Sequence, residues 1–196
     1  MNNNKGNNNK KSCASTSINW YPGHMAKTMK QIEADLRIVD IVIELLDARI
    51  PIASQNPEIA NKIKNKKKLV VLNKADLADE KTNQKWVNYF NKKQIPVVLV
   101  DSNTGKGIEN CLKQIENIMQ EDLEKHAQKG RIGRKIKVMV LGIPNVGKSS
   151  FINRIAKKTS AGVFDPSGQG LFIYIGIKYN ILLYLIYLFY HFHFCR

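Results

Sequence analysis

Four short apolar runs, separated by amphipathic segments, constrain the fold of this chain more than any other feature of its sequence. Each run is nearly continuous and rich in β-branched residues, which is typical of strands buried on both faces of a parallel sheet. The runs lie at Ile38 to Leu46, Lys68 to Leu72, Ile95 to Val100 and Ile136 to Leu141. Strands and helices that alternate at this spacing predict a parallel sheet with right-handed crossovers. We therefore expect a three-layer α/β domain with helices on both faces of the sheet.

The segments between these runs carry the signals of helices. Asn56, Pro57 and Glu58 offer an N-cap, a first-position proline and an acidic first turn. Other segments place apolar residues at helical spacing, so that each presents one apolar face to the sheet. These faces consist of Met25, Met29, Ile32 and Leu36, then of Trp86, Val87 and Phe90, and then of Ile108, Leu112, Ile115, Met119 and Leu123.

The sequence from Gly142 to Ser149 reads G-I-P-N-V-G-K-S and fits the phosphate-loop pattern G-x-x-x-x-G-K-[ST]. It follows an apolar strand and precedes the helical segment Phe151 to Ile155, which is the context that this loop requires. Its glycines let backbone N–H groups turn toward phosphate oxygens, and the helix N-terminus adds positive potential. Lys148 would reach the β- and γ-phosphates of a nucleotide, and the Ser149 hydroxyl would bind Mg²⁺. The alternative is a glycine-rich turn without a ligand.

A second loop, N-K-A-D, follows the second apolar run, at the edge where open α/β sheets bind ligands. The carboxylate of Asp76 can accept hydrogen bonds from N1–H and the 2-amino group of guanine. Adenine lacks both donors, so the buried acceptor would stay unpaired against ATP. Lys74 can cover the face of the base, and Asn73 can tie this loop to the phosphate loop. Alone the motif could be an ordinary polar turn, but beside a phosphate loop it indicates GTP.

A third loop, from Asp101 to Gly105, follows the third apolar run, and the Ser102 N–H group is placed to donate to O6 of guanine. By itself this loop is little more than a turn signal. Both base-reading loops precede the phosphate loop, which reverses the order of ordinary GTPases. A circularly permuted GTPase has this order, because its strands keep their places in the sheet while the sequence order rotates.

Three motifs in unbroken order resemble the ribosome biogenesis GTPase A family of bacterial circularly permuted GTPases. They read W-Y-P-G-H-M-A-K from Trp20, D-A-R-I-P from Asp47 and G-I-P-N-V-G-K-S from Gly142, and the resemblance covers about Asn19 to Ser160. It implies a P-loop GTPase-like fold that is circularly permuted. It also implies GTP binding and hydrolysis during late assembly of the large (50S) ribosomal subunit.

The resemblance also assigns roles to residues. The nucleotide-binding residues that it and the loops imply are Asn73, Lys74, Asp76, Asp101, Ser102, Asn145, Val146, Gly147, Lys148, Ser149 and Ser150. In this family hydrolysis is assisted by K⁺, for which Asn145 is the matching ligand, and a histidine, here His24, orients the attacking water. Lys148 and His24 are thus the expected catalytic residues. For His24 a capping or packing role beside a Pro-Gly turn is the alternative.

Two parts of a working GTPase are missing after the phosphate-loop helix: a switch threonine and a D-x-x-G loop at the end of a strand. Asp165 to Gly168 spells D-P-S-G, but it lies too close to Lys148 to leave room for the intervening strands. By the same resemblance, we expect this sequence to lack the helical C-terminal domain of the family. We therefore expect an incomplete domain with uncertain turnover. A guanine-nucleotide-binding protein without turnover and a tail-anchored, membrane-associated GTP-binding protein stay open as alternatives.

The sequence divides into three parts. Residues 1–17 form an Asn- and Lys-rich arm expected to be disordered, residues 18–163 the partial GTP-binding domain, and residues 164–196 an aberrant apolar and aromatic tail. The tail could be a short membrane anchor, a pair of strands that completes the sheet, or the product of a truncated or frame-shifted gene, which we favour. On that interpretation one edge of the parallel sheet, beside the phosphate-loop strand, would be uncovered.

Charge and cysteine content bound the partners and the compartment. The chain has 31 Lys and Arg against 16 Asp and Glu, a net charge of +15, which favours an anionic partner such as rRNA. The basic stretches Lys62 to Lys68 and Lys129 to Lys137 could contact rRNA phosphates or could be solvated helix ends. The three cysteines are isolated, which excludes a disulfide framework and a zinc site. No apolar signal segment begins the chain, so we expect a cytoplasmic protein and no membrane partner.

Overall fold

The computed structural model of the chain describes residues 30, 32–131, 134, 136–159, 162–164, 171–175 and 181–185. The strands in this part of the chain are β1 (Ile41–Asp47), β2 (Lys67–Asn73), β3 (Val97–Leu99), β4 (Ile136–Leu141), β5 (Gly162–Phe164), β6 (Leu171–Ile175) and β7 (Ile181–Leu185). The helices are α2 (Pro57–Lys62), α3 (Glu80–Lys92), α4 (Ile108–Gln128) and α5 (Lys148–Thr159), with a 3₁₀ turn η1 (Ala75–Leu77). All four strands expected from the apolar runs are present.

The described strands form one sheet in the order β3-β2-β1-β4-β7-β6-β5. The pairs from β3 through β2, β1 and β4 to β7 are all parallel, whereas β6 pairs antiparallel with both β7 and β5. In the register of β1 and β2, Asp47 lies opposite Asn73, so both residues end their strands at the carboxyl edge of the sheet. The loops that follow β1, β2, β3 and β4 therefore emerge together at this edge.

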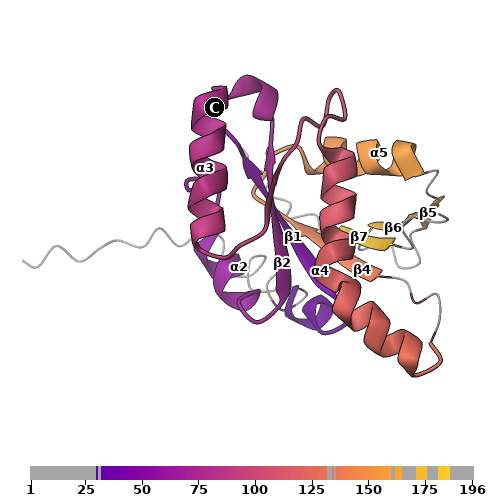
Figure 1. Ribbon diagram of the computed structural model, residues 1–196. Coiled ribbons are helices and arrows are strands. Elements are labelled where there is room, and N and C mark those ends of the chain that lie inside the picture. Colours follow the sequence, from indigo (N-terminus) through magenta and orange to yellow (C-terminus); the bar gives the residue numbers. More distant parts are fainter. Residues whose placement is uncertain are drawn as a thin grey trace, which may run out of the picture.

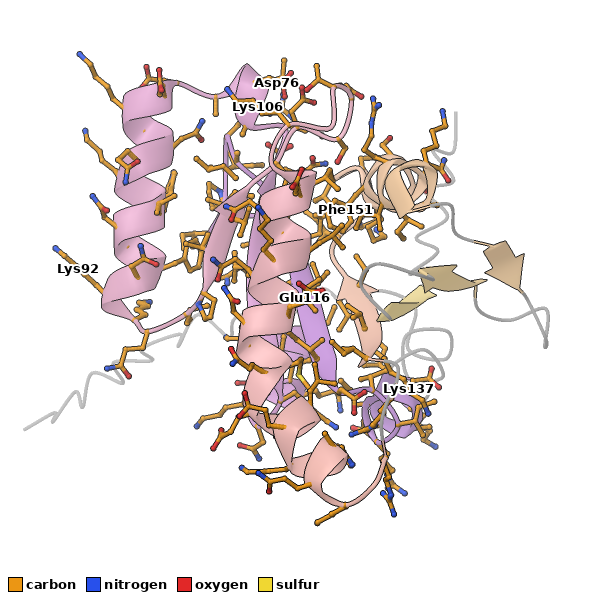
Figure 2. All side chains as sticks on the ribbon, turned by 45° about the vertical axis from the view of Figure 1, so that its right-hand side comes forward. Asp76, Lys92, Lys106, Glu116, Lys137 and Phe151 are labelled. Atoms are coloured by element: carbon orange, nitrogen blue, oxygen red, sulfur yellow. The ribbon has the colours of Figure 1, made fainter. Side chains whose placement is uncertain are left out.

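Helices cover both faces of the sheet, as Figure 1 shows, which confirms the three-layer α/β fold. Side chains alternate between the two faces along each strand. On one face Ile43 and Leu45 of β1 pack with residues of α4 and α5, among them Phe151, which points toward the sheet in Figure 2. On the other face Val42 packs with residues of α2, and a second cluster joins Phe90 of α3 to β2.

The helix signals of the sequence act as expected. Asn56 caps α2, because its Oδ1 accepts hydrogen bonds from the backbone N–H groups of Glu58 at 2.9 Å and Ile59 at 3.3 Å. The apolar stripe of α4 is buried from Ile108 to Met119. Of the stripe that precedes β1, Ile32 and Leu36 are buried, and the two methionines lie outside the described residues.

The edge beside β4 is covered, so the prediction of an uncovered edge is wrong. β7 pairs with β4 in parallel from Ile136 opposite Ile181 to Val140 opposite Leu185. β6 and β7 match the alternative in which the tail adds strands to the sheet, and β5 spans the expected boundary after residue 163. The arm, the W-Y-P-G-H-M-A-K motif and the D-P-S-G sequence lie outside the described residues. Within the described part, none of the helices has the length and apolar character that crossing a membrane requires.

Candidate functional site

The loop between β4 and α5 has a backbone that specific glycines make possible. A Cβ on Gly142 would lie 2.6 Å from the carbonyl oxygen of Leu45, and one on Gly147 would lie 2.4 Å from Nδ2 of Asn73. Gly147 also has a φ of +93°, and Asn145 adopts the left-handed region with a φ of +64°. The two glycines therefore let the loop lie against both β1 and the N-K-A-D loop, as a phosphate-binding loop requires.

Lys148 begins α5 and is almost fully buried in the loop. Its Nζ donates hydrogen bonds to the carbonyl oxygens of Gly142 at 3.1 Å and Ile143 at 2.8 Å. Among the described residues it forms no ion pair with a carboxylate, and burial lowers its pKa to about 8. A buried amine bound only to carbonyl oxygens at a helix N-terminus is suited to an anionic ligand.

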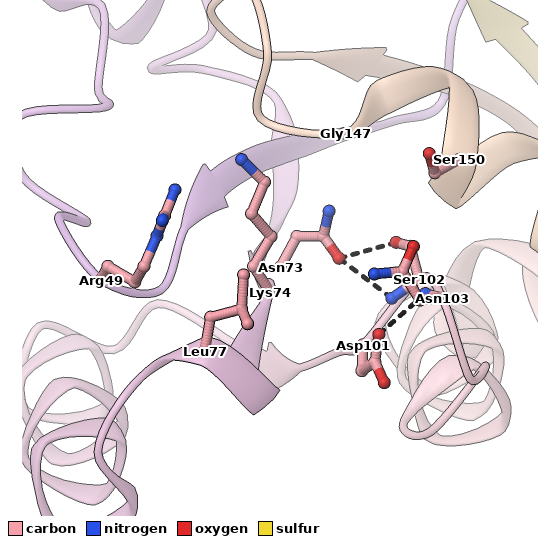
Figure 3. A pocket seen from close by; sticks show the side chains of 9 residues that line it. All are labelled: Arg49, Asn73, Lys74, Leu77, Asp101, Ser102, Asn103, Gly147 and Ser150. Atoms are coloured by element: carbon pink, nitrogen blue, oxygen red, sulfur yellow. Dashed lines mark hydrogen bonds between the residues drawn. The ribbon is translucent and has the colours of Figure 1, made fainter.

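Asn73 ties the base-reading loops to the phosphate loop, as its position predicts. Its side chain is buried and its Nδ2 donates to the carbonyl oxygen of Val146 at 2.7 Å. Its Oδ1 accepts from Ser102 twice, from the backbone N at 3.2 Å and from Oγ at 2.6 Å (Figure 3). One amide side chain therefore sets the relative positions of three loops.

Lys74 also reaches the phosphate loop. It has a left-handed backbone with a φ of +59°, and its Nζ donates to the carbonyl oxygen of Asn145 at 2.7 Å and to Oδ2 of Asp47 at 3.0 Å. Arg49 binds the same carboxylate in a fork, with Nε to Oδ1 at 2.9 Å and Nη2 to Oδ2 at 2.7 Å. The hydrogen bonds from Arg49 and then Lys74 hold the pKa of Asp47 well below its usual range, although burial opposes them. Asp47 thus holds the side chain of Lys74 at the mouth of the site.

The third loop is shaped by its own side chains. Oδ1 of Asp101 accepts from the backbone N of Asn103 at 2.8 Å, and Oδ2 accepts from the backbone N and the hydroxyl of Thr104. The bond from the Thr104 hydroxyl is the main cause that lowers the pKa of Asp101. The N–H group of Ser102 is bound to Asn73, so the predicted donation to guanine O6 would have to replace that bond.

These loops surround a hollow of about 260 Å³ at the carboxyl edge of the sheet (Figure 3). It is lined by Arg49, Asn73, Lys74, Leu77, Asp101, Ser102, Asn103, Gly147 and Ser150. Pockets that hold whole small ligands usually measure about 300–1,000 Å³. The hollow is therefore large enough for one part of a nucleotide, with the remainder over the exposed start of α5.

The other predicted site residues are not among those that line this hollow. Asp76, in η1, is exposed and does not line it; Figure 2 shows this residue at the opposite end of the molecule from Lys137. Asn145 and Ser149 are exposed, and Val146 is buried. His24 lies outside the described residues. The structure thus brings the phosphate loop and the base-reading loops together, whereas His24 stays a prediction.

Some features of the site were missed by sequence reasoning. The D-A-R segment served only as a mark of resemblance, yet Asp47 binds Lys74 and Arg49 lines the hollow. Arg154 of α5 belongs to no motif, yet its Nε donates to the carbonyl oxygen of Ser102 at 3.1 Å. For Asp47 and Arg49 the available signal was a pair of opposite charges directly after a predicted strand. The sequence carried no signal that Arg154 belongs to the site.

Part of the lysine-rich stretch is engaged within the protein. Nζ of Lys66 donates to the carbonyl oxygen of Val39 at 3.0 Å, and Nζ of Lys67 forms an ion pair with Asp122 at 2.9 Å. Lys62 forms an ion pair with Glu33. These contacts hold the loop before β2 against its neighbours, so only some of the lysines are available to a partner.

Comparison with known proteins agrees with the motifs. A model of the family described as 50S ribosome-binding GTPase matches residues 137–175, a range that extends past Val163. Ribosome biogenesis GTPase A of Bacillus licheniformis is 43% identical over 151 residues, which are 77% of this chain and 53% of that relative. Mitochondrial ribosome-associated GTPase 1 of Bos taurus is 38% identical over 146 residues, covering 71% of this chain and 41% of that protein.

A solved structure shows the same fold. GNP-bound YlqF from T. maritima superposes with a TM-score of 0.55 and 26% sequence identity, covering 82% of this chain and 59% of that one. The chain spans about half the length of the curated relatives that it matches. The resemblance stated from the motifs and the α/β fold of a circularly permuted GTPase are thus confirmed.

Proposed function

We propose that this chain, a relative of ribosome biogenesis GTPase A, binds GTP and GDP and acts in the cytoplasm as a GTP-hydrolysing factor in late assembly of the large (50S) ribosomal subunit. The observation that supports nucleotide binding is the buried Asn73 side chain, which joins the phosphate loop and the two base-reading loops around one hollow. A glycine-rich turn without a ligand needs no such connection.

The chemistry of the loops supports a guanine nucleotide. The phosphates would lie over the N-terminus of α5, where Lys148 supplies a buried amine and the loop supplies backbone N–H groups. The base would lie beside Lys74, whose aliphatic stem can cover its face, and Asp76 would accept hydrogen bonds from N1–H and the 2-amino group. Asp76 lies on the surface in η1, so base binding would have to enclose it.

The residues present fit Mg²⁺ bound together with nucleotide phosphates. The described residues contain no group of three or more His, Cys, Asp and Glu side chains that could hold a metal by themselves. Mg²⁺ in phosphate sites commonly uses one or two protein ligands and takes the rest from phosphates and water, and the exposed Ser149 hydroxyl suits this role. The ion would neutralise charge on the phosphates during transfer. We assign the Asn145 side chain as the K⁺ ligand and His24 as the group that orients water.

Nucleotide titrations test the binding proposal. GDP should bind more tightly than ADP, and Lys148→Ala should weaken the binding of both nucleotides. Asp76→Asn should reduce the preference for guanine, whereas Glu80→Gln, which alters a nearby exposed carboxylate, should leave it unchanged. Equal affinity of the unaltered chain for GDP and ADP would refute guanine recognition.

Turnover and the ribosomal partner need separate measurements. GTP hydrolysis that is lost in Lys148→Ala would support an enzyme; binding without hydrolysis would support the alternative of a nucleotide-binding protein without turnover. The net charge of +15 supports rRNA as the partner. GTP-dependent co-sedimentation with 50S subunits or their precursors, and not with 30S subunits, tests that assignment.

A further inference from the structure

We propose that Arg154 is a positioning residue for guanine recognition, because it fixes the base-side loop (residues 101–105) relative to the phosphate loop. The inference rests on the proposed binding of a guanine nucleotide and adds a residue that lies in none of the nucleotide-binding motifs. Arg154 is on α5, the helix that begins at Lys148, so it can connect the two ends of the site.

Ser102 is held from two sides. On one side its backbone N and its Oγ donate to Oδ1 of Asn73 at 3.2 Å and 2.6 Å. On the other side its carbonyl oxygen accepts a hydrogen bond from Nε of Arg154 at 3.1 Å. A charged donor forms a stronger bond to a carbonyl oxygen than a neutral donor does, and this one is partly buried. The peptide at the base end of the hollow is therefore fixed by Arg154 as well as by Asn73.

The aliphatic stem of Arg154 also packs against the loop. Gly105 has a φ of +89°, and a Cβ placed on it would lie 3.0 Å from Cδ of Arg154. The positive charge of Arg154 further contributes to lowering the pKa of Asp101, after the hydrogen bonds within the loop. Arg154 thus interacts with Asp101, Ser102 and Gly105, the first, second and last residues of the base-side loop.

These contacts close a ring around the hollow. From the Val146 carbonyl the ring passes through the side chain of Asn73 to Ser102, on to Arg154, and back along α5 to Lys148. Among the side-chain hydrogen bonds of the described residues, those of Asn73 would remain, without Arg154, to join the base-side loop to the phosphate loop. The phosphate loop keeps its own contacts, so loss of Arg154 should affect base selection more than phosphate binding.

The test uses variants of the full chain and two nucleotides that differ only in the base. Arg154→Met keeps most of the packing against Gly105 and removes the donor, and Arg154→Lys returns a cationic donor. Lys157→Met is the matched control, since it removes an exposed cation from the same helix. Affinities for GDP and ADP are measured by competition with a fluorescent guanine nucleotide, and the melting temperature of each variant is recorded without nucleotide.

We expect Arg154→Met to weaken the binding of GDP about tenfold, as loss of a charged hydrogen bond predicts. The affinity for ADP should change less than about twofold. Arg154→Lys should recover part of the preference, and the control should match the unaltered chain. A Met variant with an unchanged ratio of GDP to ADP affinity would overturn the inference alone. An unaltered chain that does not prefer GDP would instead overturn the proposed function.

A second variant covers the case in which Arg154→Met does not fold. Gly105→Ala would press a methyl group on the stem of Arg154 at a strained backbone position, so it should also lower the preference for GDP. An unchanged ratio of GDP to ADP affinity in Gly105→Ala would overturn the inference.

Discussion

The buried amine of Lys148 predicts that nucleotide binding weakens as the pH rises from 7 to 9. Burial lowers the pKa of this amine to about 8 in the free protein. Bound phosphate favours the ammonium form, so the pKa of Lys148 rises on binding and the protein takes up a proton. The affinity for the nucleotide is therefore highest below the pKa of Lys148 in the free protein, and it falls as the pH rises through that pKa.

The size of the effect follows from the pKa of Lys148. With a pKa of about 8, roughly one tenth of the free protein has a neutral Lys148 at pH 7 and roughly nine tenths at pH 9. Binding must restore the proton, so the dissociation constant of GDP should rise about tenfold over this range. This equals about 1.4 kcal/mol of binding free energy.

Titration calorimetry at pH 8 in two buffers with different ionisation enthalpies measures the proton uptake directly. We expect uptake of about half a proton per GDP bound. Lys148→Arg supplies the control, because a guanidinium does not titrate in this range and any ionisation of the base itself affects both proteins equally. Equal pH dependence in both proteins, or no net proton uptake at pH 8, would refute the argument.

Other buried groups make further predictions. Glu44 is buried, and its Oε2 has no hydrogen-bond partner among the described residues. Burial raises the pKa of this carboxyl group, so the protein loses stability as the pH rises through the pKa of Glu44 in the folded state. Glu44→Gln should therefore stabilise by about 1 kcal/mol at pH 8 and less at pH 5, as thermal melts at both values would show; an equal gain at both would contradict this. Gly147→Ala should abolish most GDP binding, because its Cβ meets Asn73, whereas Gly130→Ala, at a φ of +74° with nothing within 4 Å, should not; equal binding in both would contradict the steric reason. Asp47→Asn should lower the free energy of unfolding by about 1 kcal/mol at pH 7. The loss is modest because Arg49, one of the cationic partners of Asp47, is half exposed. Since the carboxylate pKa is lowered, this difference should disappear in strong acid, and a difference that persists there in chemical denaturation would argue against ion pairing.

The sequence predicted the parts of the fold that depend on local pattern. The strands, the Asn56 cap and the stripe of α4 follow from hydrophobic period and capping chemistry, and the structure confirms them. The phosphate loop and N-K-A-D loop follow from residue types at fixed spacing, and the connection through Asn73 follows from their placement in one sheet. The tail has no polar alternation, so its pairing with β4 could be stated only as one alternative among three.

What the sequence could not predict depends on contacts between distant residues. The bond from Arg154 to Ser102 joins a helix to a loop far earlier in the chain, and neither residue type indicates it. The N–H group of Ser102 has a partner in Asn73 for the same reason. An arginine on an amphipathic helix reads as a solvated surface residue, and only the folded arrangement shows that its stem crosses Gly105.

The position of β4 between β1 and β7 has a consequence for folding. β4 pairs with β1 from Ile41 opposite Val138 to Glu44 opposite Leu141, so the phosphate loop reaches the base-side loops only after a long-range docking step. A nucleotide that contacts both sides of this junction binds the docked form alone and stabilises it by mass action. Docking of β4 and nucleotide binding are therefore linked equilibria, and amide hydrogen exchange in β4 should slow as nucleotide concentration rises.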